Sequence, residues 1–160
     1  MNEFPLDAID LALLSQLQTN ATLSNQDLAA AVQVSPPTAL RRVRRLHEAG
    51  LIERQVAVLN ADRLGALRGH GLTALAEVSL DRQDAAALDA FEARAVADDA
   101  VQQCYRVSPG PDFVLVLAVA DMPGYHALAQ RLFNTDANVR NVKAFFSVKR
   151  AKFDTRVVLG

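Results

Sequence analysis

The chain has 160 residues, of which 51% are hydrophobic, enough for one ordinary domain or two small ones, and this excludes a mainly disordered protein. Polar residues interrupt every hydrophobic segment before the roughly 20 residues that a membrane span needs. The first residues also lack the basic stretch and apolar run of a secretory signal, so a cytoplasmic protein is expected. With one cysteine and three scattered histidines, we expect no disulfide, no metal site and no cofactor.

The net charge of −1 hides a segregation of charge along the sequence. Residues 1–59 hold five arginines and six acids, and residues 60–139 hold six arginines and eleven acids. Residues 140–160 hold six basic residues and one acid. Four of the first five arginines lie within five positions, at 41, 42, 44 and 45. Charge therefore has to be considered segment by segment.

The first 59 residues are expected to form three helices and a β-wing. Apolar residues recur at helical spacing over residues 7–18, which predicts an amphipathic helix with one buried face. Two further helices are predicted over residues 25–32 and 36–49, each preceded by a serine that can cap its free amides. The capping residues are Ser24 and Ser35. Residues 51–59 are β-branched and alternating, which predicts a strand or hairpin.

A second domain is expected after residues 60–71, which contain three glycines, have weak periodicity and are typical of a connector. The patterns that follow predict, in order, a strand, a helix, two strands, a helix and a strand. Their expected ranges are 72–80, 84–97, 101–107, 113–120, 123–133 and 142–150. This order is the ferredoxin-like arrangement, in which two helices cover one face of an antiparallel sheet and the other face is left open. An open apolar face needs a partner.

The predicted fold class is therefore α+β. A winged helix-turn-helix domain occupies residues 1–59, a linker residues 60–71, and a ferredoxin-like domain residues 72–160.

The third helix carries the residue pattern that points to DNA. On a helical wheel Leu40, Val43 and Leu46 form one face, while Thr38, Arg41 and Arg45 lie opposite with Arg42 beside them. Guanidinium groups on such a helix can bind guanine edges or clamp phosphates in the major groove. The alternative is a solvated charged helix, but no acid lies between positions 36 and 47. The residues expected to contact DNA are Ser35, Pro37, Thr38, Arg41, Arg42 and Arg45.

Several motifs together resemble the Lrp/AsnC family of transcriptional regulators. In the first half they are residues 6–10 (LDAID), 23–29 (LSNQDLA), 35–46 (SPPTALRRVRRL) and 49–52 (AGLI). In the second half they are residues 76–80 (AEVSL), 104–108 (CYRVS), 112–115 (DFVL) and the final basic strand. The resemblance covers nearly the whole chain, and the motifs are specific in this order although each alone is weak.

The resemblance implies a homodimer that pairs the open sheet faces, assembles further into tetramers or octamers, and binds a pseudo-palindromic operator in double-stranded DNA. It also implies an amino-acid effector near the loop between the second and third strands, here residues 108–112. The family has a Gly-Asp pair and a later Asp in this loop; here Pro109 and Gly110 replace the pair, and only the later acid remains. The residues expected at this site are Val107, Ser108, Gly110 and Asp112.

Two physical interpretations of this loop stay open. Its prolines restrict the backbone, Gly110 permits positive φ, and free amides with Asp112 suit the carboxylate and ammonium of an amino acid. A rigid β-turn without a ligand accounts for the same residues.

Two other functions share the predicted architecture. Siroheme decarboxylases resemble it but act on a tetrapyrrole, and they have no need of four clustered arginines on the third helix. A DNA-organising protein without an effector is the other alternative. No catalytic residue is expected, because Cys104 has no neighbouring base and is assigned to packing.

Overall fold

The computed structural model describes residues 5–68 and 71–159. The chain divides into two compact units. One contains the residues up to Val58 together with those from Lys152 onward, and the other is Leu59–Ala151. The return of residues 152–159 to the first unit was not part of the predicted organisation, which placed them in the second domain.

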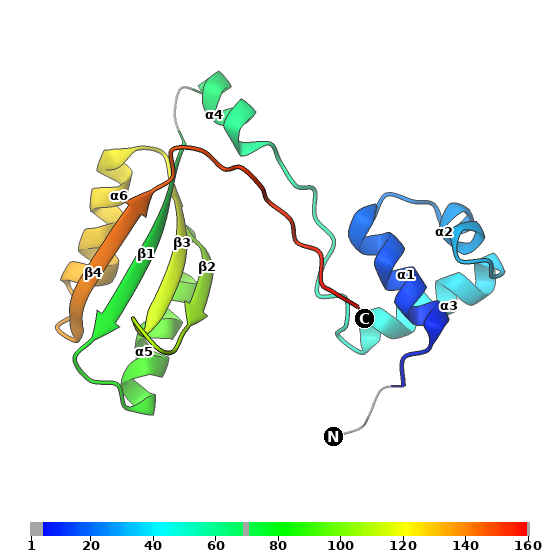
Figure 1. Ribbon diagram of the computed structural model, residues 1–160, viewed down its shortest axis with the longest axis horizontal. Coiled ribbons are helices and arrows are strands. Elements are labelled where there is room, and N and C mark those ends of the chain that lie inside the picture. Colours follow the sequence, from blue (N-terminus) through cyan, green and yellow to red (C-terminus); the bar gives the residue numbers. More distant parts are fainter. Residues whose placement is uncertain (1–4, 69–70, 160) are drawn as a thin grey trace. The chain divides into compact units, whose positions relative to one another are not determined.

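The first unit is built on three helices, α1 (Ala8–Thr19), α2 (Asn25–Ala31) and α3 (Pro36–Glu48), as predicted (Figure 1). They enclose a small apolar core to which each contributes. The buried members are Leu13, Leu28, Ala29, Ala39 and Leu46. Gly50 ends α3 with a φ of +70°, the left-handed conformation that glycine adopts at helix ends without strain.

Of the two predicted serine caps one is formed, and the first helix is capped by an aspartate. Asp7 accepts the N–H groups of Ile9 and Asp10 at the start of α1, both at 3.0 Å, and Ser24 accepts the N–H of Asp27 at 3.1 Å. Ser35 makes no such bond. Its hydroxyl lies 2.8 Å from the Thr38 hydroxyl instead, so the predicted capping role of Ser35 is wrong.

The strand predicted over residues 51–59 is not formed. Residues 53–60 have no regular secondary structure, and every one of them is exposed. A strand requires a neighbour for its backbone N–H and C=O groups, and none of the strands in the described part of the chain pairs with this stretch. Alternation alone therefore predicted a wing strand for which residues 5–68 and 71–159 offer no pairing partner.

A side chain of α1 binds the backbone of the C-terminal segment. The Gln18 amide donates to the carbonyl of Val157 at 3.1 Å and accepts the N–H of the same residue at 2.8 Å. One side-chain amide thus satisfies both backbone groups of Val157, as a neighbouring strand would.

The second unit contains a four-stranded antiparallel sheet in the order β2-β3-β1-β4. Its strands are β1 (Leu72–Leu80), β2 (Val101–Arg106), β3 (Phe113–Val119) and β4 (Val139–Phe146). The last strand begins and ends a few residues before its predicted range.

Two helices, α5 (Ala85–Ala97) and α6 (Met122–Ala129), cover one face of this sheet (Figure 1). The second continues into the π-helical segment η1 (Gln130–Asn134). The linker predicted at 60–71 contains a further helix, α4 (Ala61–Arg68), and its residues 69–70 lie outside the described ones.

The residues of β1 and β3 alternate between a buried and an open face, as the predicted fold requires. The buried face of β1 and β3 packs against α5 and α6 and forms the core of this unit. Cys104 packs against the same core, where burial raises the pKa of its thiol. The opposite face carries Leu75, Val116 and Phe145 at one level of the sheet register, and Leu75 and Phe145 are exposed. An apolar patch therefore remains uncovered on the single chain.

Candidate nucleic-acid interface

The presentation of α3 is fixed by the turn that joins it to α2. Gln33 adopts a φ of +57°, and the N–H of Val34 donates to the carbonyl of Ala29 at 3.0 Å. The Asn25 side chain at the start of α2 donates to the carbonyl of Pro36 at 2.9 Å, which joins the N-terminal ends of both helices. This is the geometry of a helix-turn-helix, whose second helix enters the DNA groove.

One side of α3 faces the core and the other faces solvent. The core side is formed by Ala39, Val43 and Leu46. The solvent side is a stripe at i, i+3, i+4 and i+7 spacing that we call the outward stripe. It consists of Pro37, Leu40, Arg41 and Arg44, all exposed. The assignment of Leu40 to the packed face was therefore wrong, because Ala39 occupies that place.

Two other arginines of α3 are engaged by carboxylates at the start of α1. The Arg42 guanidinium donates to Asp7 at 2.7 Å and to Asp10 at 2.9 Å, and Arg45 donates to Asp10 at 2.5 Å. The Asp10 side chain is completely buried, and only 19% of the Arg42 side chain is exposed. We call Asp7, Asp10, Arg42 and Arg45 the charge cluster.

The charge cluster is close to neutral, since it contains two carboxylates and two guanidiniums. Hydrogen bonds from the Asp10 N–H and from Arg42 lower the pKa of Asp7, and the bonds to Asp7 and Asp10 raise the pKa of Arg42. Both groups are therefore held in their charged forms. Within residues 5–68 and 71–159, neither Arg41 nor Arg44 has an ion-pair partner. The positive charge that α3 offers to a ligand is concentrated on the outward stripe.

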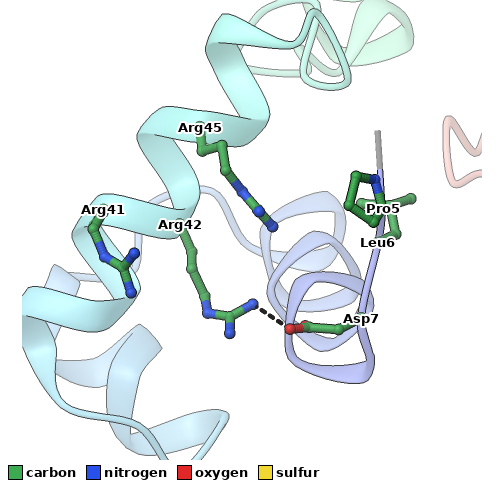
Figure 2. Close-up of a pocket in the computed structure, with 6 residues that line it drawn as sticks. All are labelled: Pro5, Leu6, Asp7, Arg41, Arg42 and Arg45. Carbon is green, nitrogen blue, oxygen red and sulfur yellow. Dashed lines mark hydrogen bonds and ion pairs between the residues drawn. The ribbon is translucent and has the colours of Figure 1, made fainter. Parts of the chain in front are cut away.

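A hollow of about 250 Å³ lies beside the charge cluster (Figure 2). It is lined by Pro5, Leu6, Asp7, Arg41, Arg42 and Arg45. Figure 2 shows Arg42 reaching from α3 to Asp7 at the start of α1, while Arg41 leaves α3 without reaching toward that carboxylate. The Arg42 Nε is buried there without a hydrogen-bond partner in the described structure. The chemistry of this surface suits an anionic ligand that guanidinium groups can bind.

The structure corrects the sequence prediction for Arg42, which was expected to face DNA. Its guanidinium is mostly buried and held by two carboxylates of its own chain. Arg45 pairs with Asp10, but 44% of its side chain is exposed. It can therefore hold the charge cluster and also meet a ligand. Thr38 is half-buried, and Ser35, Pro37 and Arg41 are exposed.

Sequence reasoning missed Leu40 as an outward-facing residue and left Arg44 out of the residues expected to contact DNA. The helical period could have found them if Ala39, rather than Leu40, had been placed in the buried set. Both choices satisfy a 3.6-residue repeat, and the larger side chain was preferred.

The loop expected to bind an effector is tied to the end of β1 through Asp112. One oxygen of this carboxylate accepts the N–H of Leu80 at 2.7 Å and the side-chain amide of Gln83 at 3.3 Å. The backbone of Asp112 also bonds to Val78 and Val107. Gly110 has a φ of +126°, as its predicted role requires, and Ser108 and Gly110 are exposed. Asp112 thus acts as an anchor of the loop.

The described residues contain neither a membrane-spanning helix nor a cluster of metal-binding side chains. No helix among them has the length and apolar character to cross a membrane. No group of three or more His, Cys, Asp or Glu side chains in residues 5–68 and 71–159 is placed to hold a metal ion.

Each half of the chain matches a family of known proteins. Residues 6–53 match the family model of a winged helix-turn-helix DNA-binding domain, and residues 73–157 match the Lrp/AsnC ligand binding domain. The leucine-responsive regulatory protein of Rhizobium meliloti is 35% identical over 147 residues, covering 92% of this chain and 92% of that protein.

Solved structures give the same result. An AsnC family transcriptional regulator from Agrobacterium tumefaciens superposes with a TM-score of 0.84 at 27% identity, covering 96% of this chain and 97% of that one. A transcriptional regulator from Neisseria meningitidis, solved as a complex with L-Met, has a TM-score of 0.84 at 27% identity and covers 97% of each chain.

We predict that Asp10→Asn lowers the free energy of unfolding of the first unit by about 3 kcal/mol, since it leaves charged partners of a buried carboxylate uncompensated. Urea denaturation followed by circular dichroism measures this change. Glu53→Gln is the matched control, because Glu53 is exposed and the same charge is removed. Equal stability of the Asp10 variant and the control would show that the charge cluster does not stabilise the unit.

A second prediction concerns the stability of the fold at low pH. Because folding lowers the pKa of Asp7 below its ordinary value of 3.8, this carboxylate stabilises the fold above that value and stops doing so as the pH falls through the lowered pKa. Between about pH 5 and about pH 3, the wild type should therefore lose more stability than Asp7→Asn does. Denaturation curves across this range test the difference, and parallel losses would contradict it.

Proposed function

The chain belongs to the Lrp/AsnC family of transcriptional regulators, and we propose that it binds double-stranded DNA through the outward stripe of α3. The observation that supports this proposal is the pair of guanidiniums, Arg41 and Arg44, that no carboxylate of the described chain neutralises.

Different residues of α3 have different proposed roles. Arg41 and Arg44 contact guanine edges or phosphates, since a guanidinium can donate two parallel bonds to either. Ser35, Pro37 and Thr38 lie at the start of the helix, where they approach the DNA backbone. Arg45 adds a contact from the rim of the charge cluster. Arg42 is a positioning residue that fixes α3 against α1.

The proposed operator follows from a proposed dimer. The open sheet face, with exposed Leu75 and Phe145, is the surface expected to pair with a second copy, since apolar area of this kind is normally covered. A two-fold axis places two copies of α3 on one duplex and requires two half-sites, spaced by about one helical turn or a multiple of it. Dimers of this kind would then assemble into tetramers or octamers.

The proposed effector is an amino acid or a related metabolite bound near residues 107–112. Support comes from the match to a ligand-binding domain and from the L-Met complex of the Neisseria relative. Ser108 and Gly110 are exposed and offer backbone amides to a carboxylate, with Val107 beside them. Because one oxygen of Asp112 is already bonded to Leu80 and Gln83, we assign Asp112 mainly to holding the loop.

We infer a regulator rather than an enzyme, because the relatives that match along most of the chain are named as transcriptional regulators. A DNA target also favours the cytoplasmic location expected from the sequence.

Arg41→Ala should weaken binding to a selected operator about 5- to 150-fold, the range expected for loss of a bidentate contact. The operator is obtained by selection from random duplexes, and affinity is measured by gel shift at several salt concentrations. If Arg41 contacts a phosphate, the log–log salt slope should also fall by about 0.9. If it contacts a base, preference at one position should relax instead.

Arg82→Ala is the control for this measurement. Arg82 is an exposed arginine of the second unit, so the variant loses the same charge but leaves every residue of α3 unchanged. Unchanged affinity of Arg41→Ala relative to Arg82→Ala would remove the outward stripe as the DNA-binding surface.

A thermal-shift screen of the amino acids and their catabolites tests the effector. A ligand at about 100 times its dissociation constant should stabilise the protein by about 2.7 kcal/mol. Gly110→Val should abolish the shift, because φ at this position is positive and a β-branched residue resists it. Absence of a shift with every compound would favour the DNA-organising alternative without an effector.

A further inference from the structure

Leu40 is exposed to solvent, whereas the other aliphatic side chains of α3 pack in the core of the first unit. Ala39 and Leu46 are fully buried and Val43 packs against the same core, but 52% of Leu40 is exposed. Leu40 takes no part in the core cluster of this unit. The fold therefore leaves much of one leucine side chain of α3 without a packing role.

The neighbours of Leu40 on the outward stripe define the kind of surface it belongs to. Pro37 lies three residues before it and Arg44 four residues after it, so all three share one face of the helix, with Arg41 adjacent. Leu40 thus lies beside two guanidiniums that have no carboxylate partner in the described chain. A stripe that combines unneutralised cations with the exposed Leu40 side chain suits a polyanion that also presents an apolar group.

Thymine is the base with such a group. The floor of the major groove presents hydrogen-bond donors and acceptors for every base pair, and the C5-methyl of thymine is its apolar feature. We propose that Leu40 packs against a thymine methyl group in the major groove, while Arg41 and Arg44 hold α3 there. This inference rests on the proposed function and adds a base preference to it.

The direct test removes the methyl group and nothing else. Each thymine of the selected operator is replaced in turn by deoxyuridine, and affinity is measured by gel shift. Removal of one buried methyl should weaken wild-type binding about three- to fivefold at one position of each half-site. The Leu40→Ala variant should bind the thymine and uracil operators equally at that position.

Two controls separate this inference from simpler explanations. Val56→Ala shortens another exposed aliphatic side chain of the same unit and should retain the wild-type preference for thymine. Leu40→Met keeps an apolar side chain of similar volume and should retain most of the preference, with circular dichroism showing that each variant is folded.

The outcomes are distinct. If the selection yields no bound DNA, the proposed function itself fails. If DNA is bound but wild type shows no thymine preference, or Leu40→Ala keeps it, the role of Leu40 is overturned. A change of oligomeric state in Leu40→Ala with an unchanged thymine preference would assign Leu40 to a contact between copies, which also overturns the inference.

Discussion

The buried carboxylate of Asp10 decides how the DNA-binding unit presents its charge. Four arginines lie close together on one helix. If all four faced outward, their like charges would repel one another and the helix would bind any polyanion. Asp10 and Asp7 take up two of them, Arg42 and Arg45, and use them to join α3 to the start of α1. The same bonds that stabilise the packing of these helices therefore select which guanidiniums remain for a ligand.

Local chemistry could be predicted from the sequence, because it depends on residues close to one another. The capping role of Ser24, the proline start of α3 and the period-2 burial of β1 are all set within a few positions. The partners of Arg42 could not be predicted in this way, since Asp7 and Asp10 lie more than 30 residues earlier. An arginine-rich helix predicts a cationic surface only until tertiary contacts show which charges are already neutralised.

The same distinction applies to the predicted wing strand and to the effector loop. Residues 51–59 have the composition of a strand, but a strand is a property of two segments, and the second segment is missing from the described part of the chain. One oxygen of the Asp112 carboxylate accepts the N–H of Leu80, 32 positions away, and this partner could not be predicted from the loop residues alone. In both cases the residue type was identified correctly and its partner was not.

The bond between Gln18 and Val157 makes the first unit discontinuous in the sequence. During synthesis, its three helices leave the ribosome well before residues 152–159 are made, and the entire second unit is translated in between. The helices must therefore begin to fold without their last segment. The first unit therefore gains the Gln18–Val157 bond only after the second unit has been translated.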